Sequence, residues 1–139
     1  MRMKISFAAI LACLLAACAH APPRTLYDDL GGKEGVEQIV ELLLTRLSDD
    51  PRIASHFAAV DIIRLNDKLV EQICFESGGP CVYTGKDMVE AHSKQKVGNA
   101  DFNALVEDLV WAMDQRKVPR TAQNRLLKRL APMHKDIVR

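Results

Sequence analysis

The apolar positions of this chain recur at the spacing of amphipathic helices over most of its length. Between residues 36 and 47, and again over 62–73 and 102–113, an apolar side chain returns every three or four residues, so each segment presents one apolar helical face. Two more helical segments are expected, a short one that reaches Phe57 and a last one over 126–137. No segment alternates cleanly enough for a strand. The pattern therefore predicts an all-α domain.

Turn and cap residues mark where these helices begin and end. Gly31-Gly32 breaks the chain before the first helix, and Asp50-Pro51 suits the start of the short segment that follows it. Asp61 can cap the third helix, and the long fourth one stops near Pro119. A second break, Gly78-Gly79-Pro80, follows the third helix, and the chain then makes one short helical turn.

The first 25 residues do not belong to this domain. A short basic start precedes an uncharged apolar run over residues 5–17, which is shorter than the roughly 20 residues that a membrane-spanning helix needs. The run ends in Leu15-Ala16-Ala17-Cys18, which resembles a bacterial lipobox. We therefore expect a lipoprotein signal peptide over 1–17, a lipidated tether over 18–25 that begins at Cys18, and a folded domain over 26–139.

The destination of the protein follows from the same segment. A lipoprotein would face the periplasm and attach to the membrane through its N-terminal lipid. Ala19, rather than an aspartate, follows the cysteine, and this resembles lipoproteins sorted to the outer membrane rather than the inner one. The alternative is an ordinary secretory signal cleaved at a nearby small residue.

Export changes how the cysteines are interpreted. Cys13 would leave with the signal peptide and Cys18 would carry the lipid, so Cys74 and Cys81 remain. In an oxidising compartment we expect these two to form a disulfide across the Gly-Gly-Pro break. No Cys-x-x-Cys-His motif occurs, which disfavours covalent c-type haem attachment, and zinc lacks ligands at its usual spacing.

The charge of the chain excludes one class of partner. Cleavage after residue 17 removes Arg2 and Lys4, which leaves 17 basic against 18 acidic residues and a net charge near −1. This balance gives no electrostatic reason to expect nucleic-acid binding.

One histidine stands out as a candidate ligand. The short turn after the second glycine break delivers His92 beside apolar residues, with no second ligand residue at metal-binding spacing. A neutral imidazole held in this way suits the axial position of a haem iron, because the porphyrin supplies the other four nitrogens. The alternative is a structural, partly buried histidine.

The order of several short motifs resembles the group I truncated haemoglobins. The motifs are Leu26-Tyr27-Asp28-Asp29-Leu30-Gly31-Gly32, Asp50-Pro51 followed by Phe57, Gly78-Gly79-Pro80, Tyr83-Thr84-Gly85, then Met88, His92 and Phe102. The resemblance covers about residues 25–138. It implies a two-on-two helical sandwich around a b-type haem, which binds a diatomic gas such as O2, NO or CO.

The resemblance also implies roles for individual residues. His92 matches the proximal iron ligand, and Phe57 matches the aromatic ring that stacks on the porphyrin. Four further residues match positions that pack the proximal side and rim of the haem, and three leucines match the distal side. These residues are Tyr83, Met88, Val97 and Phe102, and Leu44, Leu65 and Leu69.

The distal side is where the chain departs from the family. Many relatives carry a Phe-Tyr pair at Leu43-Leu44 and often a glutamine at Leu69. Their polar groups donate a hydrogen bond to bound oxygen, worth about 1–3 kcal/mol, and leucine cannot donate one. We therefore expect weaker discrimination against NO and CO.

Two polar residues share the predicted helical face with Leu65 and Leu69. Lys68 has three interpretations: contact with a haem propionate or solvent, a sixth iron ligand as in some group I members, or a solvated surface residue. Gln72 is expected at the rim or in solvent, with a distal hydrogen bond as the alternative. His56 and His134 are expected to face solvent.

Three functions remain open from the sequence. The first is a membrane-anchored haemoglobin that binds diatomic gases. The second is a haem redox enzyme, such as an NO dioxygenase or peroxidase, or an electron-transfer protein. It would need a separate reductase, because this chain contains no flavin- or NAD-binding segment. The third is a haem-free lipoprotein adaptor in which His92 and Phe57 are core residues.

Overall fold

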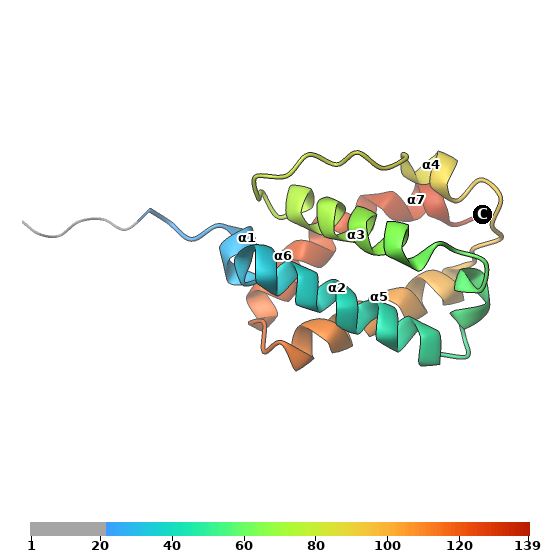
Figure 1. The fold of residues 1–139 in the computed structure, drawn as a ribbon, viewed down its shortest axis with the longest axis horizontal. Coiled ribbons are helices and arrows are strands. Elements are labelled where there is room, and N and C mark those ends of the chain that lie inside the picture. The colour runs from blue at the N-terminus through green and yellow to red at the C-terminus, as the bar shows by residue number, and fades with distance from the viewer. Residues whose placement is uncertain (1–21) are drawn as a thin grey trace, which may run out of the picture.

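The structure, a computed structural model, describes residues 22–139 and contains helices and no strand within that range (Figure 1). The all-α prediction is therefore confirmed. The expected signal peptide and the lipidation residue Cys18 lie outside the described residues. The helices are α1 (Leu26–Asp29), α2 (Gly32–Asp49), the 3-10 turn η2 (Ala54–Phe57), α3 (Ile62–Glu76), α4 (Met88–Ala91), α5 (Asn99–Gln115), α6 (Arg120–Leu130), the 3-10 turn η3 (Ala131–Met133) and α7 (His134–Ile137).

The long helices form two layers. In Figure 1, α2 and α3 pass in front of α5 and α6. Helix α2 packs against both α3 and α5, and α6 packs against α1, α3 and α5. This arrangement is the two-on-two sandwich that the family resemblance implies. None of the described helices combines the length and the apolar character needed to cross a membrane.

The core lies between these layers and is built from the apolar faces that the periodicity marks. Most of its side chains come from α1, α2, α3, α5 and α6, and many of them are fully buried. The members buried most deeply include Val36, Ile39, Val40, Ala112, Met113 and Leu126. Burial of each large side chain contributes about 1.5–3 kcal/mol, which fixes the crossing of the helices.

Capping residues set the ends of α3 and shape the segment after it. The Asp61 carboxylate accepts a hydrogen bond from the Arg64 backbone amide, as its cap position predicts. After the helix, Gly78 adopts a φ of 80°, which favours glycine. A Cβ atom on Gly79 would lie 2.6 Å from both the Cys74 sulfur and the Tyr27 ring, so only glycine fits there.

The segment between α3 and α4 is tied back to α3. Cys74 and Cys81 form a disulfide with a Cα–Cα distance of 5.8 Å, as expected from the sequence. Cys74 is buried in the last turn of α3, and Cys81 lies in the extended segment that leads to His92. The bridge therefore restricts the path of that segment.

Two elements differ from their predicted form. The last helix is not continuous: Pro132 lies within η3, between α6 and α7. Proline lacks the amide hydrogen that a continuous helix requires, which accounts for the break. The segment before Phe57 is a single 3-10 turn, and Asp50 closes the preceding turn by accepting a hydrogen bond of 2.9 Å from the Arg52 amide.

Candidate functional site

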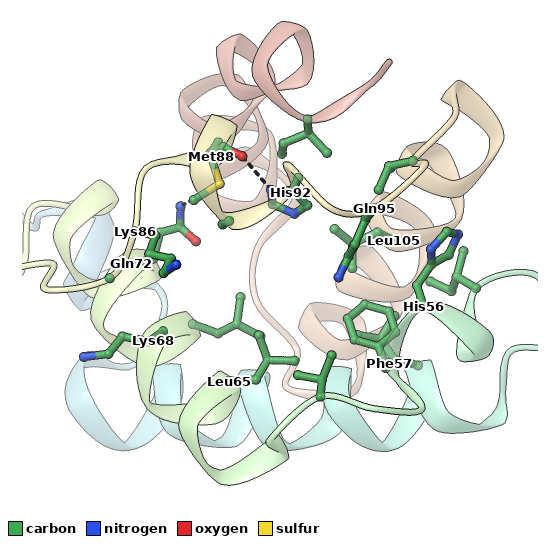
Figure 2. A pocket seen from close by; sticks show the side chains of 18 of the residues that line it. His56, Phe57, Leu65, Lys68, Gln72, Lys86, Met88, His92, Gln95 and Leu105 are labelled. Carbon is green, nitrogen blue, oxygen red and sulfur yellow. Dashed lines mark hydrogen bonds between the residues drawn. The ribbon is translucent and has the colours of Figure 1, made fainter.

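A cavity of about 420 Å³ lies between η2, α3, α4 and α5 (Figure 2). This volume falls within the range of small-molecule sites in proteins. Most of the exposed wall is apolar, although the lining also includes polar and charged side chains, among them Asp61 and Asp101. The apolar residues around it include Leu47, Ile53, Val60, Leu105 and Ile137.

His92 enters this cavity from the C-terminal end of α4. Its Nδ1 lies 2.9 Å from the Met88 carbonyl oxygen, which can only accept a hydrogen bond. Nδ1 must therefore carry the proton, and a neutral ring then leaves the lone pair of Nε2 free. In Figure 2 the His92 ring points into the cavity, and Leu65 and Phe57 lie on the opposite side.

Local contacts hold α4, and with it His92, in place. The Asp87 carboxylate caps the helix by accepting a hydrogen bond of 2.7 Å from the Glu90 amide, and Lys86 forms an ion pair with Glu90. The Tyr83 hydroxyl donates to the Lys86 carbonyl at 2.7 Å. Burial of Tyr83, with nearby carboxylates, raises the pKa of its hydroxyl. The phenol therefore remains a donor at neutral pH.

The wall opposite His92 is aromatic and aliphatic. Phe57 extends from η2, and Leu65 and Leu69 extend from α3; all three line the cavity. Phe57 and Leu69 also pack on the hydrophobic core, which fixes their positions. No leucine or phenylalanine side chain carries a hydrogen-bond donor, so this wall offers only dispersion contacts.

Basic side chains line one part of the cavity. Arg64, Lys68 and Lys86 come from α3 and from the segment before α4. The Lys68 ammonium donates to both Glu71 carboxylate oxygens, at 2.8 and 3.0 Å, and to the Thr84 hydroxyl at 2.6 Å. In Figure 2 its side chain extends away from the centre of the cavity.

The contacts of Glu71 stabilise this position of Lys68. Besides Lys68, the Glu71 carboxylate accepts hydrogen bonds from the Thr84 amide and hydroxyl, at 2.9 and 2.8 Å. These hydrogen bonds, that of Lys68 above all, lower the pKa of Glu71 to about 2. The carboxylate thus stays ionised and holds Lys68 outside the cavity centre.

The donor set around the cavity fits an iron porphyrin better than a bare metal ion. Within residues 22–139 no group of three or more His, Cys, Asp or Glu side chains could hold a metal ion. His92 is thus a single ligand, which suits an iron whose remaining ligands come from the cofactor. The apolar wall matches the porphyrin ring, and the basic residues match its carboxylates.

Comparison with known proteins gives the same answer. The Bacterial-like globin family matches residues 25–139. This chain belongs to that family. It is 30% identical over 124 residues to Group 1 truncated hemoglobin GlbN of Mycolicibacterium paratuberculosis. The alignment covers 89% of this chain and 91% of the relative. The corresponding protein of Tetrahymena pyriformis is 28% identical, over 84% of this chain and 96% of its own length.

Solved structures support the family assignment. The crystal structure of the Tetrahymena pyriformis truncated hemoglobin in its Fe(III) form superposes with a TM-score of 0.80. The sequence identity in this alignment is 27%, and it covers 83% of this chain and 98% of the other. As a globin, this chain is a haem protein of the class that binds diatomic gases.

The structure brings nine of the ten expected site residues of this globin around one cavity. They are Phe57, Leu65, Lys68, Leu69, Tyr83, Met88, His92, Val97 and Phe102. These residues come from elements far apart in the sequence, and each contributes to the lining.

Leu44 is the exception. It lies in a separate hollow between α2 and α3, together with Ile62 and Ile63, and does not line the cavity. Successive helical residues are about 100° apart, so the α2 face that buries Leu43 and turns Leu47 to the cavity directs Leu44 elsewhere. The expected set of three distal leucines is therefore reduced to Leu65 and Leu69.

Two histidines expected in solvent have partners in the structure. His56 lines the cavity, and its Nε2 lies 3.4 Å from an Asp101 carboxylate oxygen. The His134 ring packs edge-on against Phe102 at 4.8 Å, and its Nε2 lies 2.8 Å from the Asn99 side-chain oxygen. Their partners lie on α5, far away in sequence, so no local pattern could have found them.

Two glutamines also face this cavity. Gln72 was expected at the rim or in solvent, but it lines the cavity and donates to the sulfurs of Met88 and Met133, at 3.7 and 3.4 Å. Gln95 lies in the segment between α4 and α5 and points into the cavity in Figure 2. The periodicity gave no signal for Gln95, because that segment is not helical.

Proposed function

We propose that this globin holds a b-type haem in the cavity, with His92 as the proximal ligand of the iron, and that it reversibly binds O2, NO or CO. The observation that carries the proposal is the orientation of His92. Its Nδ1 proton is engaged by the Met88 carbonyl, and its Nε2 is left to face an apolar cavity opposite Phe57 and Leu65.

Each group of residues around the cavity would have its own role in holding the haem. When bound, the haem would supply an iron that takes up the gas. The Met88 carbonyl fixes the tautomer and orientation of His92 and increases the basicity of its Nε2. Phe57 and the leucines exclude water, and Arg64 and Lys86 are placed to pair with carboxylates at the edge of the cofactor.

The wall opposite His92 suggests which gas the pocket favours. Bound O2 carries partial negative charge and gains about 1.5–3 kcal/mol from a hydrogen-bond donor, whereas CO and NO gain less. Leu65 and Leu69 provide no donor. Gln72 is occupied by two methionine sulfurs, which are weak acceptors. We infer that the leucine wall of α3 retains O2 weakly relative to NO and CO; Gln95 and His56, which also line the cavity, lie outside α3.

We also propose that a lipid on Cys18 attaches the protein to the periplasmic face of the outer membrane. Support comes from the lipobox-like sequence before Cys18 and from the disulfide, which suits an oxidising compartment. Labelling of expressing cells with a radioactive fatty acid should mark the wild-type protein and not Cys18→Ser. An unlabelled wild-type protein would contradict the anchor and leave the haem proposal untouched.

The haem proposal is tested by absorption spectra of the chain reconstituted with haemin. The wild type should show a Soret band in the ferric and ferrous forms. His92→Ala should lose most of its haem affinity, and added imidazole should restore the spectrum by replacing the missing ligand. His134→Ala is the matched control, because His134 does not line the cavity. A spectrum unchanged in His92→Ala would refute the assignment.

A further inference from the structure

The positive charge of this nearly neutral chain is concentrated around α6. The whole sequence has a formal net charge of +1. From residue 116 to residue 135, however, it contains seven basic residues and no acidic one. These are Arg116, Lys117, Arg120, Arg125, Lys128, Arg129 and Lys135.

Three of these residues share the exposed side of α6. Arg125, Lys128 and Arg129 stand at helical spacings of three and four, so they lie on one face, which we call the basic face. Leu126 and Ala122 are buried on the other side. Arg125 pairs with Asp29 at 3.0 Å, whereas no ion pair joins Lys128 or Arg129 to another residue within 22–139.

The N-terminal segment enters the fold beside the basic face. Asp29 of α1 binds Arg24 through one carboxylate oxygen at 3.3 Å and Arg125 of α6 through the other. Arg24 and Arg125 of the basic face therefore contact the same carboxylate, that of Asp29. Cys18 is six residues before Arg24, so it can lie at most roughly 20 Å away.

We propose that the basic face of α6 binds the anionic phospholipid headgroups of the membrane. A cluster of lysine and arginine on a helix is attracted to such a surface, and the attraction increases with each charge near it. The direct observation is the unpaired charge on α6, next to the point where the chain emerges. Only the orientation that an anchor would give rests on the proposed lipidation at Cys18.

The contact would be electrostatic and would leave the cavity free. The exposed large apolar side chains of the described residues lie elsewhere, on α3, on α4 and in the segment between them, so α6 has none to insert into the bilayer. No residue of α6 lines the cavity. The membrane would therefore hold the globin by one face, with the haem site still accessible from the others.

The binding can be measured without the lipid anchor. The buried hydrophobic side chains of the described residues lie between Leu26 and Ile137, and the globin family matches residues 25–139, so residues 22–139 contain the whole folded domain. Residues 22–139 loaded with haem can therefore be sedimented with vesicles. One set of vesicles is phosphatidylcholine alone, and the other contains equal parts of phosphatidylcholine and phosphatidylglycerol.

A pair of double variants isolates the basic face from net charge. Lys128→Gln with Arg129→Gln removes two charges from it, and Lys94→Gln with Lys96→Gln removes two from the segment between α4 and α5. At low salt, each charge near the surface is worth about fivefold in affinity, so the first variant should bind the anionic vesicles about 30-fold more weakly. The second should stay close to the wild type, and salt should weaken binding of the wild type.

Several results would overturn the proposal. These are equal binding to both vesicles, unchanged binding of the α6 variant, or an equal loss in both variants. Binding to heparin but not to the vesicles would also overturn it and would point to an acidic macromolecule. The Soret band of each sample reports haem binding and folding separately, so failure of the haem site is distinguished from failure of the basic face.

Discussion

Leu69→Gln tests whether the apolar wall limits O2 retention. Leu69 lines the cavity from α3, one turn after Leu65, and glutamine places an amide donor there with little change in side-chain length. A hydrogen bond to a ligand with partial negative charge contributes about 1.5–3 kcal/mol. At 1.4 kcal/mol for each factor of ten, the O2 dissociation rate constant should fall roughly 10- to 150-fold.

The assay is stopped-flow replacement of O2 by CO, followed at the Soret band. The CO dissociation rate constant should change far less, because CO gains little from a donor. Leu44→Gln is the matched control: it makes the same substitution at the one expected distal residue that lies outside the cavity. Thermal unfolding of both variants checks that neither has lost its fold.

Two results would refute this reasoning. If Leu44→Gln slowed O2 dissociation as much as Leu69→Gln, the donor would not need to face the cavity. If Leu69→Gln slowed CO and O2 equally, the effect would be steric closure of the pocket rather than a hydrogen bond.

Three further predictions concern the contacts between α3 and the segment that follows it. Replacing Cys74 and Cys81 by serine should cost about 2.5 kcal/mol and lower the Tm by about 10 °C, measured by circular dichroism; a Tm unchanged from that of the wild type would contradict this. Since the pKa of Glu71 is lowered to about 2 from an ordinary value near 4.5, its contribution to stability is complete above about pH 5 and is lost as the pH falls towards 2. Glu71→Gln should therefore flatten the fall in Tm over this range, whereas the exposed Glu41→Gln should not. Lys68→Ala should leave the ferric absorption spectrum unchanged, because Glu71 and Thr84 hold the ammonium away from the cavity centre; a change from low to high spin would instead identify Lys68 as a sixth ligand.

Much of the fold could be predicted because the signals are local. Helical periodicity over α2, α3 and α5 marks which side chains are buried, and Asp61 marks the start of α3. Burial of those faces leaves few ways to pack the helices. The two cysteines remaining after the expected cleavage predict the disulfide.

The break at Pro132 and the 3-10 turn after Asp50 were not predicted, because a short helix and a 3-10 turn have almost the same pattern.

The sequence by itself determined the class of the protein. The order of the glycine breaks, Phe57 and His92 is a property of the chain, and it places a single imidazole after a helix-breaking segment. Tertiary structure decided what surrounds that imidazole. Leu44 and Leu47 lie only about 60° apart around α2, so the rotation of α2 against its neighbours decides which of them faces the cavity.

Contacts between elements far apart in the sequence determined the partners of the remaining site residues. His56 meets Asp101 only because η2 packs near the start of α5, and Lys68 is held by Thr84 only because the segment after the disulfide returns alongside α3. Such contacts have no period or spacing in the sequence, since they join residues whose separation is set by the packing of whole helices. The sequence therefore predicted the helices and the histidine, and the fold determined which side chains line the cavity and which face of α6 carries unpaired charge.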